Sequence, residues 1–230
     1  MINMAERAKE KSLSEVVRER RATPHFDPSA PVHEADLAKI LNAGLHAPSG
    51  YNLQPWRFVV VRDPEQRKRL RAAAFGQPKV EEAPVVIVAC GDTEGWKTGD
   101  LDEALRMAKE HGYGGDREHE QAKNAVRGFL GSQPGSVGGI APDLGVWVNR
   151  QVMIAFTTLM WMAEALGYDT APMEGFDEDS VKKLLKVPES VRVVALLAIG
   201  RLQGEDKPYG GRFPIERVCF AEEWGKPLKL

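Results

Sequence analysis

The segment from Gly145 to Leu166 constrains the fold most, because it is apolar on nearly every side of a helix. Such a helix must be covered on both sides, so we expect a sheet against one side and another body against the other. Its most apolar stretch, Val152 to Ala163, contains two threonines and is shorter than the roughly 20 residues that a membrane-spanning helix needs. The segment therefore predicts a buried helix, and a partner subunit is a candidate for its second cover.

Three further runs predict the strands of a sheet. The run from Trp56 to Val61 is rich in aromatic and β-branched residues and ends shortly before a proline. The runs Pro84–Cys90 and Val191–Ile199 are apolar throughout, so we expect central strands with both faces covered. No internal repeat or Pro/Gly/Ser-rich linker divides the chain, which indicates a single domain over residues 1–230.

Two helices are expected ahead of these strands. Residues 12–15 (Ser-Leu-Ser-Glu) form a capping-box pattern, and the helix that they open must end before Pro24. This boundary places Arg20 and Arg21 at a helix C-terminus. Apolar residues at helical spacing over 37–45 predict the second helix.

The middle of the chain has a different character. Residues 91–145 are polar and rich in glycine, so we expect two solvent-facing helices joined by mobile loops, in a variable region that serves as a lid. His111 and His119 lie in this region, where a lone histidine is more often a solvated surface residue than a ligand or a base. Residues 1–12 are expected to be a flexible N-terminal extension, and they lack the apolar stretch of a secretory signal.

Charge and cysteine usage limit the partners. The chain has 31 Lys and Arg against 33 Asp and Glu, for a net charge of −2, and no segment concentrates the basic residues. We therefore expect no nucleic-acid or membrane partner, and small molecules or proteins are favoured. Cys90 and Cys219 lie far apart among apolar neighbours, which indicates a reducing compartment rather than a disulfide framework or zinc site. The expected location is the cytoplasm, and no metal site is expected.

The common catalytic signatures are absent from the sequence. It has no glycine-rich dinucleotide or Walker loop, no His-Glu-x-x-His zinc motif, no Gly-x-Ser-x-Gly elbow and no Cys-x-x-Cys pair. Without an evident nucleophile, metal set or base, catalysis should depend on an organic cofactor that scattered groups hold.

Three stretches suit such a cofactor. Residues 20–26 present two guanidinium groups, which bind phosphate oxygens through paired N–H donors, although helix C-termini favour cations in any case. Residues 47–56 form a polar loop whose amide side chains can bond the edge of a heteroaromatic ring, although Asn, Gly and Pro also suit an ordinary connection. Residues 171–177 follow the long helix, and Gly175 would allow a close backbone approach.

Taken in order, these stretches resemble a known family. The motifs are Arg-Arg-x-x-x-x-Phe from Arg20, Ala-Pro-Ser-x-x-Asn-x-Gln-Pro-Trp from Ala47, Gly76-Gln77 ahead of Val-x-x-Ala-Pro, and Pro-Met-Glu-Gly-Phe from Pro172. Together they span the chain from about Arg20 to Phe220 and resemble the FMN-dependent nitroreductase family. The resemblance implies an α+β fold with a central, mostly antiparallel sheet flanked by helices. It also implies an intertwined homodimer with two FMN sites at its interface.

The same resemblance implies contacts to FMN, residue by residue. The phosphate and ribityl end would lie at Arg20, Arg21, Ala22 and Arg212, the polar edge of the flavin at Gln77, and the ring at Pro172, Met173, Glu174 and Gly175. The other subunit would contribute Pro48, Ser49, Gly50 and Asn52. The backbone N–H of Glu174 would donate to flavin N5, and no side chain would act as a catalytic base.

The implied activity is transfer of hydride from NADH or NADPH to flavin N5, followed by reduction of a nitroaromatic or related electron-poor small molecule, in ping-pong order. Alternatives keep the flavin and change the reaction, because the same fold hosts reduction of activated alkenes such as enones, reductive dehalogenation and flavin breakdown. A flavin-binding or sensory protein without turnover is a third alternative.

Three positions depart from the pattern of the family. Ala22 stands where serine is common, Pro24 where a basic residue is common, and Gly210 where some members carry lysine. A cation near flavin N1 stabilises the anionic reduced ring, so Pro24 predicts a flavin that is harder to reduce unless Lys79 supplies the charge.

Overall fold

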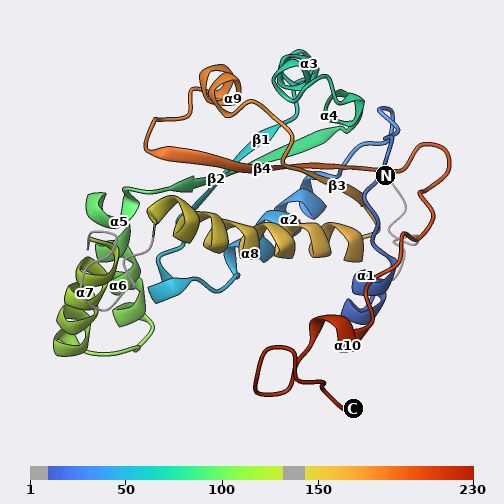
Figure 1. The fold of residues 1–230 in the computed structure, drawn as a ribbon. Helices are drawn as coiled ribbons and strands as arrows, with labels where there is room; N and C mark the ends of the chain where they lie inside the picture. Colours follow the sequence, from blue (N-terminus) through green and yellow to red (C-terminus); the bar gives the residue numbers. More distant parts are fainter. Residues whose placement is uncertain (1–9, 132–142) are drawn as a thin grey trace.

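Four antiparallel strands form the middle layer of the fold, in the order β1-β2-β4-β3 (Figure 1). They are β1 (Trp56–Val61), β2 (Val85–Asp92), β3 (Asp169–Met173) and β4 (Val191–Gly200). This computed structural model describes residues 10–131 and 143–230. The antiparallel sheet with helices on both faces confirms the α+β class, and β1, β2 and β4 confirm the three predicted strands.

The two central strands divide the apolar core into two halves. Successive side chains of a strand point to opposite faces, so Ile87 of β2 joins Leu197 of β4 in one half. Val88 and Leu196 join the other half, and all four side chains are fully buried. Helices cover both faces, which explains why these two runs lack the polar alternation of a half-exposed strand.

Strand β3 is not among the predicted strands, because its residues do not look like a strand. Pro172 lies within it, and proline is tolerated here because β3 is at the edge of the sheet, where a missing N–H costs no ladder bond. The outer side of β3 meets the segment that follows α1. Ala22 and Thr170 form an isolated parallel bridge, and the Thr23 N–H donates to the Thr170 carbonyl at 3.0 Å.

Helices form the outer layers (Figure 1). One face of the sheet carries α3 (Pro64–Ala73), α4 (Pro78–Glu82) and α9 (Glu178–Leu185), and the other carries α2 (Glu34–Leu45) and α8 (Leu144–Ala165). Helix α1 (Leu13–Glu19) packs against α8. It begins with the predicted capping box, in which Ser12 Oγ accepts from the Glu15 N–H, and its C-cap is Arg20, as expected.

Helix α8 lies along the sheet, as the sequence predicts. Val152 and Phe156 pack in the core on this side and are fully buried. The opposite side exposes apolar residues seven or eight positions apart, which form one stripe along a helix. This α8 stripe consists of Val146, Ile154 and Trp161, which are 45%, 41% and 37% exposed. No helix in the described residues is both long and apolar enough to cross a bilayer.

The polar middle segment extends to one side of the sheet, at the left of Figure 1. It contains the short α5 (Gly95–Thr98) and two longer helices, α6 (Asp100–Glu110) and α7 (Asp116–Leu130), as predicted. Residues 132–142 of the expected lid and residues 1–9 of the expected extension lie outside the described residues.

The last part of the chain, residues 203–230, runs outside the layers and contains only α10 (Ile215–Val218) as a helix (Figure 1). We call it the C-terminal arm. Several of its large apolar side chains are exposed, including Phe213, Val218 and Trp224, the last at 92%.

Gly91 provides a test of the packing between β2 and α8. A Cβ at this position would collide with Val148 Cγ1 and stand 2.9 Å from Val152 Cγ2, both in the core. We expect Gly91→Ala to lower the free energy of unfolding by about 1–3 kcal/mol, measured by urea denaturation. Gly128→Ala is the control, because no atom lies within 4 Å of that Cβ and alanine is the better helix former by about 1 kcal/mol. Equal effects of the two substitutions would contradict the packing.

Candidate functional site

Two arginines from opposite ends of the chain contact one tyrosine, and a third, Arg20, lies near both of them. Arg20 and Arg21 follow α1, and Arg212 and Tyr209 belong to the C-terminal arm. The Cζ atoms of Arg21 and Arg212 lie 4.7 and 5.6 Å from the centroid of the Tyr209 ring, as in cation–π contacts. The sequence predicts the three arginines as a group, and the structure brings them together.

These guanidinium groups have no carboxylate partner at ion-pair distance within residues 10–131 and 143–230. They donate instead to backbone carbonyls, Arg20 to Arg21 at 2.7 Å and Arg212 to Gly211 at 2.6 Å. Burial lowers the pKa of Arg20, and the charges of Arg212 and Arg21 lower it further, against the opposing charges of Glu164 and, less strongly, Asp206. The arrangement is a concentration of positive charge that suits an anion.

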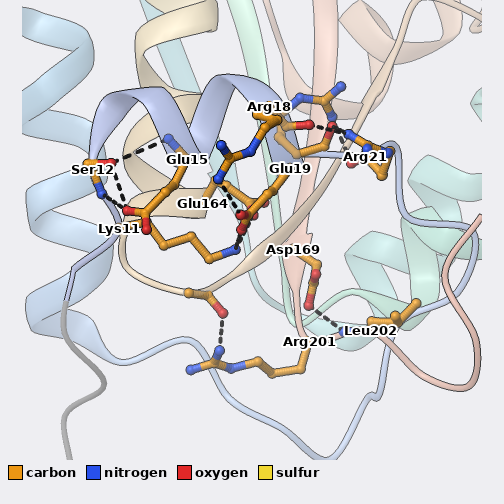
Figure 2. Close-up of polar contacts among 12 residues, drawn as sticks. Lys11, Ser12, Glu15, Arg18, Glu19, Arg21, Glu164, Asp169, Arg201 and Leu202 are labelled. Carbon is orange, nitrogen blue, oxygen red and sulfur yellow. Dashed lines mark hydrogen bonds and ion pairs between the residues drawn. The ribbon is translucent and has the colours of Figure 1, made fainter. Parts of the chain in front are cut away.

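A buried carboxylate lies behind this cluster. Glu164, near the end of α8, is 6% exposed, and its Oε1 lies 2.7 Å from Lys11 Nζ. The hydrogen bond to Glu164 raises the pKa of Lys11 above its ordinary value. Figure 2 shows Lys11 reaching Glu164 beside α1, with Arg21 beyond the end of that helix. The pair fastens α1, and with it the first two arginines, to α8.

The side chain of Gln77 holds the segment that follows β3. The Gln77 Nε2 donates to the Gly175 carbonyl at 2.7 Å and to the Ala74 carbonyl at 3.2 Å. Because Thr23 bonds Thr170, residues 20–23 lie along the same edge strand. One edge of the sheet thus gathers most of the predicted site. Its members are Arg20, Arg21, Ala22, Gln77, Pro172, Met173, Glu174, Gly175 and Arg212.

The residue after Pro24 contacts α4, the helix that contains Lys79. His25 Nδ1 is 3.2 Å from both oxygens of Glu82 in α4, so Pro24 lies beside that helix. Lys79 belongs to the same helix, where burial lowers its pKa and the nearby charge of Lys207 lowers it further. Lys79 and Lys207 therefore lie near each other, and Lys79 shares its helix with the residue that His25 contacts.

The loop with Pro48, Ser49, Gly50 and Asn52 lies at the other end of α8. Its Gly50 N–H donates to Gln151 Oε1 at 2.8 Å. Gln151 and Glu164 are 13 positions apart in α8, which corresponds to roughly 20 Å along the helix. A single chain therefore does not bring this loop to the arginines.

The same loop has a strained backbone. Tyr51, Asn52 and Gln54 have φ values of 54°, 53° and 47°, in the left-handed region. Such a conformation costs roughly 1–2 kcal/mol for a residue other than glycine, with asparagine the best tolerated. Ser49 Oγ accepts from the Gln54 N–H at 3.0 Å and holds the loop in this form. Strain of this kind concentrates at functional sites.

A cavity of about 820 Å³ lies between this loop and the two long helices of the middle segment. Its wall on the loop side is polar, and the facing walls of α6 and α7 are largely apolar. The lining includes Tyr51, Asn52, Gln54, Leu101, Ala104 and Val126. His111 and His119 also line it; His111 is exposed, as expected of a surface histidine, and His119 is half-buried. Sequence reasoning missed both the cavity and Tyr209, because only the folded chain brings their parts together.

Comparisons with known proteins cover most of the chain. The model of the nitroreductase family matches residues 17–201. The chain is 41% identical over 190 residues to an NADH dehydrogenase of Thermus thermophilus, covering 83% of this chain and 86% of that protein. It is 28% identical over 205 residues to Bacillus subtilis MhqN, named as an NAD(P)H nitroreductase, covering 88% and 95%.

Solved structures match the chain as well. A protein of Exiguobacterium sibiricum, described as a nitroreductase in complex with FMN, superposes with a TM-score of 0.82 at 26% identity, over 94% of this chain and 100% of that one. The match by family model covers most of the chain, and the similarity in fold covers nearly all of it. The chain therefore belongs to the nitroreductase family.

Proposed function

We propose that this protein is an FMN-dependent oxidoreductase that uses NADH or NADPH to reduce nitroaromatic or related electron-poor small molecules. The convergence of Arg20, Arg21 and Arg212, without carboxylate partners among the described residues, carries the proposal. The names of the two relatives and the FMN complex of the Exiguobacterium protein support it.

The residues present fit FMN at both of its ends. A phosphate dianion would match the excess positive charge of the arginines, and each charge-assisted hydrogen bond contributes about 1.5–3 kcal/mol. At the ring end, Gln77 Oε1 offers an acceptor, since its Nε2 already donates to the Gly175 and Ala74 carbonyls, and the segment from Pro172 to Gly175 offers backbone groups. A Cβ added at Gly175 would make only ordinary van der Waals contact, 3.5 Å from Gln77 Nε2, so the backbone is open on this side.

Bound FMN supplies the redox chemistry, because flavin N5 accepts hydride and the ring passes electrons on. The residues of this chain bind and orient. The arginines would fix the phosphate, and the backbone N–H of Glu174 would donate at N5 and so set the position of the ring. Neither half of the reaction requires a side-chain base, which agrees with a site built mainly from arginines, amides and backbone.

The cavity beside Asn52 is the proposed place of the electron acceptor. Its apolar walls on α6 and α7 suit an aromatic body, and the amides of Asn52 and Gln54 can donate to nitro oxygens. The donor nucleotide and the acceptor would use this space in turn, which accounts for ping-pong order. In this scheme residues 91–145 set the choice of acceptor, and the enzyme acts in the cytoplasm.

The site is complete only with a second copy of the chain. The loop of Ser49 and Asn52 lies roughly 20 Å from Glu164 along α8, so an antiparallel pair of α8 helices would bring each loop to the arginines of the other copy. The α8 stripe and the exposed apolar side chains of the C-terminal arm are the surfaces that such a copy would cover. We therefore propose a homodimer with two shared FMN sites.

The two half-reactions test the proposed function. The purified protein, loaded with FMN, should lose its visible flavin absorption when NADH or NADPH is added without oxygen, and nitrobenzene should restore it. Initial rates against both substrates should give parallel double-reciprocal lines. An enone or a halogenated phenol that reoxidises the flavin far faster than nitrobenzene would favour the alternative reactions. Flavin that stays oxidised with either nucleotide would contradict reductase activity and favour a sensory role.

Arg20→Ala and Arg212→Ala test the phosphate end. Each should raise the Kd for FMN about 10- to 100-fold, because one charge-assisted contact to the phosphate is lost. The Kd for riboflavin, which lacks the phosphate, should stay unchanged. Arg18→Ala is the matched control, because Arg18 is exposed on α1 and pairs with Glu19. Fluorescence titration with FMN and with riboflavin measures both Kd values. An equal loss of affinity for the two flavins would contradict the assignment of these arginines to the phosphate.

Ile154→Glu tests the shared site. A buried charge at the centre of the α8 stripe should convert the dimer to a monomer and release FMN, measured by sedimentation velocity and by the flavin spectrum of the separated species. Ala72→Glu is the control, because Ala72 is exposed on α3, which covers the opposite face of the sheet from α8 (Figure 1). A folded monomer that retains FMN would contradict the model of two shared sites.

A further inference from the structure

Phe75 has an unusual place at the end of α3. It follows the C-cap Ala74 with a φ of 53°, in the left-handed region where glycine is the usual residue after a helix. Its side chain is nevertheless large and 71% exposed. A bulky residue in this conformation is strained, and exposure gives it no compensation from core packing.

The turn around Phe75 is fixed by several hydrogen bonds. The Gly76 N–H donates to the Arg71 carbonyl at 2.9 Å, and Arg71 Nε donates back to the Gly76 carbonyl at 3.0 Å. The Gln77 N–H donates to the Ala74 carbonyl at 3.2 Å. These bonds hold the backbone in its strained form, so the ring projects from a rigid support.

The ring borders the segment that we propose for the flavin. A Cβ added at Gly175 would lie 4.0 Å from Phe75 Cδ2 and 3.5 Å from Gln77 Nε2. Phe75 and Gln77 therefore flank the same glycine, Gln77 through its hydrogen bond and Phe75 through its ring edge. An exposed aromatic ring that is held rigidly beside a binding segment is available to a planar ligand.

We propose that Phe75 determines the specificity of the acceptor site, as a rigid platform against which a planar aromatic acceptor packs beside the flavin, where the cavity of the second copy would meet it. This inference rests on the proposed function and goes further, because it assigns to Phe75 the preference for planar aromatic acceptors over non-planar ones. A preorganised ring loses little conformational freedom when the acceptor binds, which explains why a strained position retains phenylalanine.

The test uses the FMN-loaded protein and Phe75→Asn. Asparagine tolerates the left-handed backbone, so the variant should unfold about 1–3 °C higher than the wild type. The Kd of nitrobenzene for the oxidised protein, measured by equilibrium dialysis, should rise about three- to tenfold. The ratio of kcat/KM for nitrobenzene to that for ferricyanide, which has no planar ring, should fall by a similar factor, mainly through KM. Phe75→Tyr should restore both values.

Lys186→Asn is the matched control. Lys186 ends α9 with a φ of 55° and is exposed, so the same substitution relieves the same backbone strain away from the flavin segment. It should raise the unfolding temperature and leave nitrobenzene binding and the kinetic ratio unchanged.

Three results would overturn the inference. Phe75→Asn could change stability alone, with an unchanged Kd and an unchanged ratio. It could lower turnover of nitrobenzene and ferricyanide equally, or it could dissociate the dimer, in which case Phe75 packs against the second copy. Failure of the proposed function is a separate result, because the wild type would then keep its flavin oxidised in the presence of NADH and NADPH.

Discussion

A helix that is apolar all round has to be covered on every side, and within one chain the sheet, α2 and α1 cover only part of α8. The stripe of Val146, Ile154 and Trp161 remains exposed on its other side. The same helix separates the two halves of the proposed site, with Gln151 holding the loop at one end and Glu164 lying near Arg20 at the other. Covering the stripe with a second copy and completing the site are therefore a single requirement.

The carboxylate of Glu164 lies on the inner side of the three arginines, toward α8. Glu164 is buried and paired with Lys11, so it stabilises the positive charge near Arg20 without occupying the outward side of the arginines. A carboxylate directly across from Arg20 or Arg212 would neutralise the charge and compete with a phosphate. The arrangement keeps three guanidinium groups close together, which is costly without a ligand and favourable with a dianion.

The sequence predicted those strands and helices that depend on residues close together in the chain. The β-branched run of β1, the apolar runs of β2 and β4, the capping box at Ser12 and the long helix α8 were all identified from the sequence. Strand β3 was missed, because Pro172 suggests a turn and only pairing with β4 makes the segment a strand. The cavity and the position of Tyr209 could not be predicted, since each requires contacts between distant segments. The motifs found the arginines, but only the fold shows that they meet.

Backbone strain follows the proposed site closely. Six residues other than glycine have positive φ in the described residues, and four of them, Tyr51, Asn52, Gln54 and Phe75, belong to the cavity loop or to the turn beside Gly175. Glycine or asparagine would relieve this strain at three of the four positions, and the chain carries larger side chains there instead. Their retention is costly for stability, so it has to be offset by what those side chains contact. The loop residues Tyr51, Asn52 and Gln54 face the cavity, and the ring of Phe75 faces the flavin segment. Both the loop and the turn that carries Phe75 are held rigid by hydrogen bonds.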